Sequence, residues 1–214
     1  MSTQTPTRPK VIYPESDRQP MADNTLQFEW ITTIKGGLDA LFMNDPNVFV
    51  AGDLFWYPVE GDNTIRRAPD AMAVFGRPKG HRGSYLQWEE DNIPLQVVFE
   101  ILSPGNRGGE LVRKFNFYER YGVEEYYVYD PDRGDLTGWR RVGDKLQEIP
   151  SMAGWVSPRL GIRFQLVDGV LCILRPDGRP FATYLELTKQ RDQEHHRAER
   201  LAAQLKALGV EPEV

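Results

Sequence analysis

The sequence predicts an α/β fold in which a mixed β-sheet core is flanked by helices. The segment 94–102 is almost continuously apolar, which is typical of a strand buried on both faces. A helical pattern follows at 109–121, and a second strand pattern follows at 125–131. A strand, a helix and a strand in this order form a crossover unit, so we expect these two strands to run parallel. Many short strand patterns elsewhere make the predicted sheet mixed.

The first predicted elements along the chain are an arm, a helix and three short strands. Residues 1–23 are polar and proline-rich without periodicity, so we expect a mobile N-terminal arm. From residue 24, apolar side chains recur every three or four positions, which predicts a helix over 24–44 capped by Asp23 or Asn24. Apolar runs predict the three strands, at 48–51, 54–57 and 69–75.

The second half of the chain consists of strand patterns followed by a helical tail. Further strands are expected near 136–141, 145–149, 160–166, 169–175 and 180–186. Residues 187–214 predict a charged amphipathic helical tail, whose apolar positions are Leu187, Leu201, Leu205 and Leu208. These patterns predict one domain at 24–186, between the N-terminal arm and this charged C-terminal helix.

The composition excludes several classes of protein. Of 214 residues, 40% are hydrophobic and 27% charged, which excludes a wholly disordered chain. No apolar run approaches the length of a membrane span, and no secretory signal pattern is seen, so we expect no membrane contact and a cytoplasmic location. Cys172 is the single cysteine and the chain has three histidines, which argues against a disulfide or a Cys/His metal site.

The net charge of −5 restricts how nucleic acid could be bound. Residues 188–214 carry equal numbers of acidic and basic side chains, so the negative surplus belongs to residues 1–187. A general attraction to phosphates is therefore excluded, and any nucleic-acid contact has to come from a local basic patch.

Glu100 interrupts the most apolar strand pattern of the chain. A buried carboxylate without a partner costs several kcal/mol, so this residue either has a specific partner or binds a metal. A partner arginine such as Arg66, Arg67 or Arg113 is one alternative, and a place at the exposed end of the strand is another.

Four short motifs follow one another along the chain: Pro69-Asp70, the segment PLQVVFEILSP at 94–104, Lys114 with Tyr118, and GVEEY at 122–126. Together they resemble the Uma-two family of restriction-endonuclease-like proteins, within the PD-(D/E)xK nuclease superfamily. The resemblance is closest over 69–131. It implies a restriction-endonuclease-like fold and a Mg- or Mn-dependent endonuclease that hydrolyses phosphodiester bonds of nucleic acid, DNA in preference to RNA, as a homodimer.

The resemblance also implies roles for individual residues. Asp70, Glu100 and the backbone carbonyl of Ile101 would hold Mg²⁺ or Mn²⁺. The superfamily places a lysine two residues after the second acid, where this chain has Leu102. In the Uma-two branch the lysine comes from the following helix, which makes Lys114 the residue that would orient or help deprotonate the attacking water.

Two further side chains have a functional and a plain interpretation. Tyr118 lies one helical turn after Lys114, so it could contact phosphate or steady the lysine, or it could simply pack in the core. Glu29 on the first helix could supply an additional acid, as that helix often does in the superfamily, or it could be an exposed helix residue.

The segment 76–83 contains Arg77, Lys79 and Arg82 but no acidic residue. Such a loop could follow a nucleic-acid backbone, or it could be a flexible surface loop that is basic by chance.

Two function hypotheses follow from these observations. The retained order of acid, acid and lysine favours a metal-dependent nuclease. The displaced lysine and the acidic chain favour a catalytically inactive nuclease-fold protein that acts as a binding or scaffold module.

Overall fold

The computed structural model describes residues 11–16, 21–104, 108–167 and 169–209. The chain divides into two compact units, Met1–Phe181 and Ala182–Val214. No helix in the described residues is both long and apolar enough to cross a membrane.

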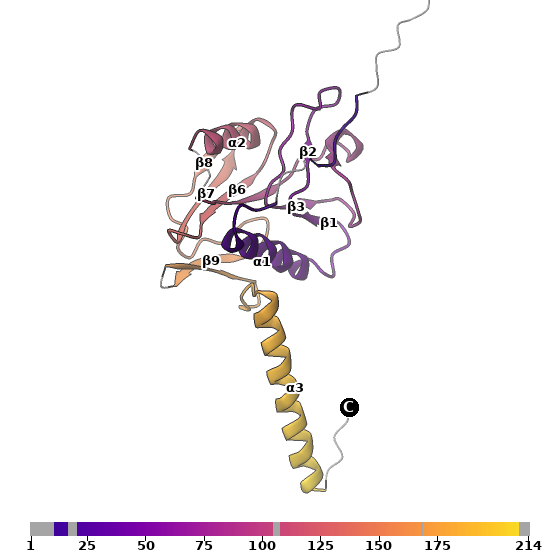
Figure 1. Cartoon of the computed structure of the whole chain (residues 1–214), viewed down its shortest axis with the longest axis vertical. Helices are drawn as coiled ribbons and strands as arrows, with labels where there is room; N and C mark the ends of the chain where they lie inside the picture. Colours follow the sequence, from indigo (N-terminus) through magenta and orange to yellow (C-terminus); the bar gives the residue numbers. More distant parts are fainter. Residues whose placement is uncertain (1–10, 17–20, 105–107, 168, 210–214) are drawn as a thin grey trace, which may run out of the picture. The chain divides into compact units, whose positions relative to one another are not determined.

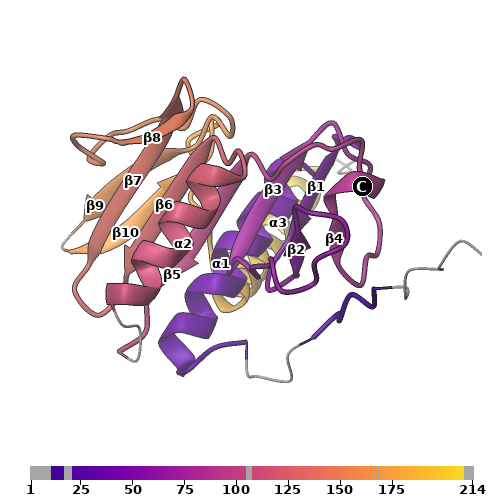
Figure 2. The same cartoon turned by 90° about the horizontal axis from the view of Figure 1, so that it is seen from above.

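The first unit is built on a six-stranded mixed sheet with the strand order β1-β3-β5-β6-β7-β8 (Figures 1 and 2). Strands β5 and β6 run parallel, and the other neighbouring pairs run antiparallel. Helix α2, Gly108–Arg120, connects β5 to β6, so the predicted crossover unit is confirmed. The strand bounds are β1 Val48–Ala51, β3 Ala71–Phe75, β5 Val97–Ile101, β6 Glu125–Asp130, β7 Asp135–Val142 and β8 Lys145–Glu148.

A hydrophobic layer covers each face of this sheet. Helix α1, Thr25–Leu41, and the hairpin of β9, Arg163–Val167, with β10, Val170–Leu174, pack against one face. Helix α2 packs against the other face, beside the short parallel pair of β2, Trp56–Tyr57, and β4, Tyr85–Leu86. Figure 1 shows α2 and α1 on opposite sides of the strands. The predicted mixed α/β fold with a sheet flanked by helices is confirmed.

Helix α1 begins and packs as its sequence pattern indicates. The Asn24 side chain accepts a hydrogen bond of 2.8 Å from the backbone N–H of Gln27, which caps the first turn. The helix ends at Leu41, earlier than the predicted residue 44. At Gly37 a Cβ atom would lie 2.2 Å from the Phe181 ring, so this glycine lets the ring sit directly on the helix.

The strand predicted at 180–186 is wrong. Pro180 makes a single bridge with Leu174, and helix α3 begins at Tyr184 and continues to Ala207. Thr183 and Glu186 form a capping box, in which each side chain bonds the other residue's backbone N–H, and this favours a helix start over a strand. The predicted charged C-terminal helix is present as α3.

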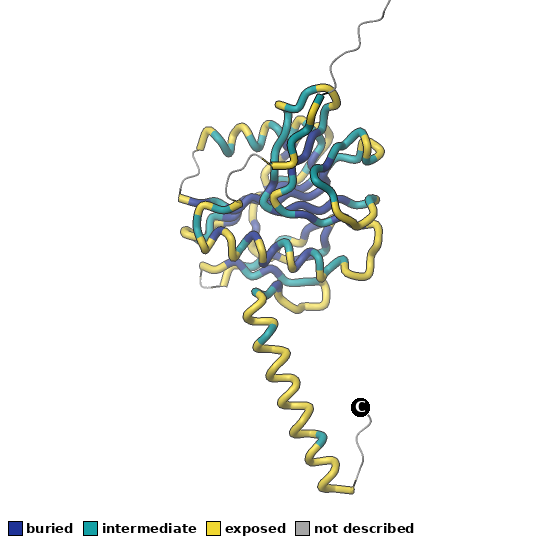
Figure 3. The backbone as a smooth tube through the Cα atoms, turned by 45° about the vertical axis from the view of Figure 1, so that its right-hand side comes forward, coloured by how far each residue is buried: buried dark blue, intermediate teal, exposed yellow. Residues whose placement is uncertain are grey.

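Parts of the predicted N-terminal arm lie outside the described residues, at 1–10 and 17–20. Residues 11–16 contact other parts of the first unit. The Tyr57 hydroxyl donates to the Pro14 carbonyl at 2.6 Å, and the Tyr13 ring lies 4.9 Å from the Trp88 ring. Trp88 belongs to η1, a short 3-10 helix at Gln87–Glu89. Figure 3 shows that buried residues concentrate in the sheet, whereas α3 contains no buried residue.

Candidate active site

Two carboxylates meet where β3 begins and β5 ends. The antiparallel register pairs Ala71 with Phe99, and one further step places Asp70 opposite Glu100. Because side chains alternate along a strand, Glu100 points to the same face as Val98, which is the face covered by α2. The backbone N–H of Ile101 donates to Asp70 Oδ2 at 2.6 Å, which fixes the first carboxylate against the end of β5.

Two side chains of α2 contact the Glu100 carboxylate. Lys114 Nζ lies 2.7 Å from Glu100 Oε2, and the Tyr118 hydroxyl donates to Oε1 at 2.5 Å. Glu100 is only 1% exposed. The ion-pair partner of this buried acid is Lys114, and not one of the arginines considered from the sequence. Lys114 and Tyr118 face the same carboxylate because they stand one turn apart on the helix.

The electrostatics of the site reflect two acids sharing one lysine. Burial, and then repulsion from Glu100, raise the pKa of Asp70 well above its ordinary value. The Ile101 N–H and the charge of Lys114 act in the opposite direction but are outweighed. Burial is the largest single influence on Lys114 and would lower its pKa. The charge and hydrogen bond of Glu100, together with the charges of Asp70 and Glu110, outweigh it, so the pKa is raised. Burial and the nearby Glu100 also raise the pKa of Tyr118 well above its usual range.

Gln27 is a site residue that the sequence analysis missed. Its Nε2 donates to the Ile101 carbonyl at 2.8 Å, while its Oε1 accepts from the backbone N–H of Asp23 at 2.8 Å. A signal was present, because Gln27 is a polar residue on the same helical stripe as the buried Ile31 and Ile34. Glu29, the predicted additional acid, is exposed on α1.

Asp53 is a second residue that the sequence analysis missed. Its backbone has a φ of 48°, a left-handed conformation that aspartate tolerates better than most residues. Its N–H donates to the Pro69 carbonyl at 2.9 Å, and its charge contributes to the raised pKa of Asp70. The fold therefore brings a third carboxylate close to the predicted pair.

The donor set at the site has the chemistry that a hard divalent ion requires. Asp70, Glu100 and the Ile101 carbonyl offer oxygen atoms, as Mg²⁺ and Mn²⁺ prefer. Two acids share one lysine here, and the raised pKa of Asp70 follows from burial first and from the nearby Glu100 second. Within the described residues, no group of three or more His, Cys, Asp or Glu side chains has the geometry of a formed metal site.

Hydrogen bonds to Glu90 and to the Phe42 carbonyl hold the predicted nucleic-acid loop, 76–83, against the rest of the protein. Arg77 Nε donates to Glu90 Oε2 at 2.8 Å, and Arg82 Nε donates to Glu90 Oε1 at 2.5 Å. Lys79 Nζ donates to the Phe42 carbonyl at 2.8 Å. The two arginines share a carboxylate that lies beyond the loop in sequence, so a contact of this loop with nucleic acid stays a prediction.

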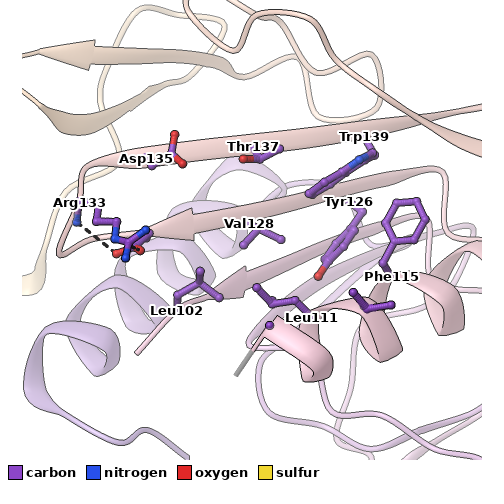
Figure 4. Close-up of a pocket in the computed structure, with 12 residues that line it drawn as sticks. Leu102, Leu111, Phe115, Tyr126, Val128, Arg133, Asp135, Thr137 and Trp139 are labelled. Carbon is purple, nitrogen blue, oxygen red and sulfur yellow. Dashed lines mark hydrogen bonds and ion pairs between the residues drawn. The ribbon is translucent and has the colours of Figure 1, made fainter. Parts of the chain in front are cut away.

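A cavity of about 470 Å³ lies on the other side of α2, between that helix, β6 and β7 (Figure 4). Tyr126 in its wall is 1% exposed, and its hydroxyl has no hydrogen-bond partner among the described residues. Burial, and then the charges of Glu100 and Asp70, raise the pKa of Tyr126. The other lining residues are Leu102, Gly108, Leu111, Val112, Phe115, Val128, Asp130, Arg133, Asp135, Thr137 and Trp139.

Comparison with known families identifies the chain. The family model Uma2, described as "Putative restriction endonuclease", matches residues 24–167. The chain belongs to the Uma2 family. The resemblance drawn from the motifs is therefore confirmed.

Among solved structures, the Uma2 chain is similar to one described as a "putative nuclease belonging to DUF820 from Anabaena variabilis ATCC 29413". The two share 14% sequence identity, with 64% of this chain and 75% of that chain covered and a TM-score of 0.49. No curated protein matches the Uma2 chain.

Proposed function

We propose that this Uma2 protein is a divalent-metal-dependent endonuclease that hydrolyses phosphodiester bonds of nucleic acid, DNA in preference to RNA. The observation that carries the proposal is the convergence of Asp70, Glu100 and Lys114 on the face of the sheet that α2 covers. Two carboxylates and a lysine at one point are the groups that metal-assisted phosphodiester hydrolysis requires. Family membership supports the same class of reaction.

Three groups of this chain would hold the ion. Asp70 and Glu100 would provide carboxylate oxygens, and Ile101 its backbone carbonyl, whose second lone pair is left after the bond from Gln27. Bound there, Mg²⁺ or Mn²⁺ would supply Lewis-acid polarisation of the phosphate and of the attacking water. Gln27 fixes the direction of the carbonyl, so it acts as a positioning residue.

Lys114 is suited to steady negative charge. Because its pKa is raised, the ammonium stays protonated at neutral pH and donates hydrogen bonds without accepting a proton. In hydrolysis the oxygen of water bonds to phosphorus and the water gives up a proton. The bond from phosphorus to a sugar oxygen breaks, and that oxygen receives a proton, so the two proton transfers balance. Lys114 orients the water and offsets the charge that develops on the phosphate oxygens.

A cleavage assay tests this proposal. Supercoiled DNA, linear DNA and RNA are incubated with the protein and Mg²⁺ or Mn²⁺, and EDTA serves as the metal-free arm. We expect metal-dependent cleavage, faster on DNA, which Lys114→Ala abolishes. Absence of cleavage of every substrate with both ions would contradict the proposal, provided that the protein binds the ions in calorimetry.

The rival function is that of an inactive nuclease-fold protein serving as a binding or scaffold module. The observation that favours it is that both oxygens of Glu100 already accept hydrogen bonds within the protein. Glu100→Ala separates the two functions. Loss of metal binding in a folded variant supports the enzyme, whereas unfolding of the variant supports a structural network.

We also propose that the protein is a homodimer in the cytoplasm and that α3 contributes to the dimer. Leu201, Leu205 and Leu208 are exposed and follow one another at spacings of four and three residues. Light scattering should give a dimeric mass that Leu205→Glu reduces. Ala203→Glu, which adds the same charge on the opposite side of the same helix, should leave the mass unchanged.

A further inference from the structure

A second pocket, of about 340 Å³, lies between α2 and the segment 64–67. Among the residues that the structure describes, no aspartate or glutamate lines it. We call it the arginine pocket, and its lining residues are Thr64, Ile65, Arg66, Arg67, Arg113, Asn116, Phe117, Arg120 and Tyr121.

The four arginines of this pocket carry charge that the protein leaves uncompensated. In the part of the chain that the structure describes, none of them forms an ion pair with a carboxylate. Arg77 and Arg82 differ, because each is paired with Glu90. Four unpaired guanidinium groups repel one another, so their gathering in a protein of net charge −5 indicates an anionic ligand.

Aromatic rings set the positions of these guanidinium groups before any ligand arrives. The Arg67 guanidinium lies 5.2 Å from the centre of the Phe117 ring, and that of Arg120 lies 5.4 Å from the Tyr121 ring. Such cation–π contacts limit the motion of the side chains. Arg67 also donates through Nη1 to the Arg66 carbonyl, which leaves the other donors of its guanidinium for a ligand. A pre-positioned guanidinium is the group that best forms paired hydrogen bonds to phosphate.

Both walls of the arginine pocket are adjacent in sequence to residues of the candidate active site. One wall ends at Arg67, three residues before Asp70. The other wall is the stripe of α2 that contains Arg113 and Phe117. Arg113 directly precedes Lys114 in the sequence, and Phe117 directly precedes Tyr118. The Trp56 ring joins the two places, because its centre lies 5.5 Å from that of Phe117 and 6.5 Å from that of Tyr118.

We propose that the arginine pocket binds backbone phosphates of a nucleic-acid strand beside the phosphodiester that reaches Asp70 and Glu100. The inference rests on the proposed nuclease function and adds to it the surface that the strand follows. It assigns the nucleic-acid contact to the unpaired arginines of this pocket, in addition to or in place of the paired arginines of the 76–83 loop.

Binding of fluorescent oligonucleotides, measured by anisotropy in EDTA, tests the proposal apart from catalysis. The variant is Arg113→Gln with Arg120→Gln, because both side chains are exposed and glutamine is a good helix former. The matched control is Arg133→Gln with Arg179→Gln, which removes the same charge from exposed arginines that are paired with Asp130 and Asp177.

We expect the pocket variant to raise the Kd about tenfold or more and to lower the slope of log Kd against log salt by about two, one for each lost phosphate contact. The control should keep the Kd and the slope of the unaltered protein. Equal Kd values for pocket variant and control would overturn the inference. So would a variant that loses binding of inorganic phosphate or a mononucleotide but keeps binding of oligonucleotides, because the pocket would then serve a small anion.

Failure of this inference and failure of the proposed function give different results. If metal-dependent cleavage survives in the pocket variant at every salt concentration, the nuclease function is supported and the role of the arginine pocket is contradicted. Arginine-dependent binding without cleavage under any metal condition keeps the pocket and removes the nuclease.

Discussion

Glu100 and Glu125 stand on neighbouring parallel strands, and both are almost completely buried, at 1% and 2% exposure. They point to opposite faces of the sheet, since Glu100 lies on the α2 side and Glu125 shares its side with Tyr127. Glu125 accepts hydrogen bonds from the hydroxyls of Tyr127 and Ser157, and from the backbone N–H of Arg159. All three donors are neutral.

Glu100 has a different environment. Its partners are the ammonium of Lys114 and the hydroxyl of Tyr118, and a second acid, Asp70, lies close enough to have its pKa raised by Glu100. A buried carboxylate needs only neutral donors to be stable, as Glu125 shows. The charges near Glu125, those of Glu124 and Arg159, pair with each other, whereas Lys114 contacts Glu100 directly. This direct ion pair of a buried acid distinguishes the candidate active site from a structural glutamate.

The largest expected difference between the two glutamates is in catalysis. Glu100→Gln removes a proposed metal ligand and should lower the rate of DNA cleavage about a thousandfold. Glu125→Gln keeps a polar group among the same neutral donors and should leave the rate within about twofold. Single-turnover cleavage with Mg²⁺ measures both, with circular dichroism as the check on folding. Equal losses in the two variants would remove the distinction.

The next effect is on stability and concerns the cation. Lys114→Met leaves Glu100 buried beside Asp70 without its partner, which should cost about 3 kcal/mol in the free energy of unfolding. Lys145→Met removes a lysine from an exposed pair with Glu119 and should cost less than about 1 kcal/mol. Urea denaturation at neutral pH compares them. A similar small cost for both would show that Lys114 does not balance the buried acids.

A smaller effect depends on pH. Because the pKa of Asp70 is raised, the folded state holds this proton more tightly than the unfolded state. The resulting stabilisation is complete below the ordinary aspartate pKa of about 3.9 and is lost as the pH rises through the raised pKa. Asp70→Asn stays neutral, so it should be more stable than the unaltered protein at neutral pH, and the difference should vanish on acidification.

Urea denaturation over a pH series measures this difference, and Mg²⁺ sharpens the comparison. The ion should stabilise the unaltered protein and Glu125→Gln alike, but Asp70→Asn much less, because only the last variant loses a proposed ligand. A stability difference between Asp70→Asn and the unaltered protein that is the same at every pH would contradict the raised pKa.

The smallest expected effects come from the neutral donors. Tyr118→Phe and Ser157→Ala each remove one hydroxyl that donates to a buried glutamate, and each should cost about 1–2 kcal/mol of stability. Only Tyr118→Phe should also change cleavage, by lowering the rate or shifting its pH profile. Thermal unfolding and cleavage rates against pH test the pair, and a catalytic defect in Ser157→Ala would blur the distinction.

The site was predictable from sequence where local patterns carried the information. An acid inside an apolar strand and a Pro-Asp pair before another strand marked Glu100 and Asp70. The family resemblance added Lys114 on the crossover helix. The structure brings these three together, because the parallel crossover places the helix over the strand that it follows. Gln27 and Asp53 carried weaker signals, since a glutamine on an apolar stripe and an aspartate in a turn are common in any sequence.

The sequence by itself determined the periodicities, and with them the central crossover, the two helices α1 and α2 and the acids on β3 and β5. These depend on alternation along a strand and on spacing along a helix, which are local properties. Tertiary structure decided which charges are neutralised. Glu90 pairs with the arginines of the 76–83 loop, whereas no carboxylate of the described residues forms an ion pair with Arg113 or Arg120. Coulomb energy depends on distance in space and on burial, and the order of residues along the chain fixes neither.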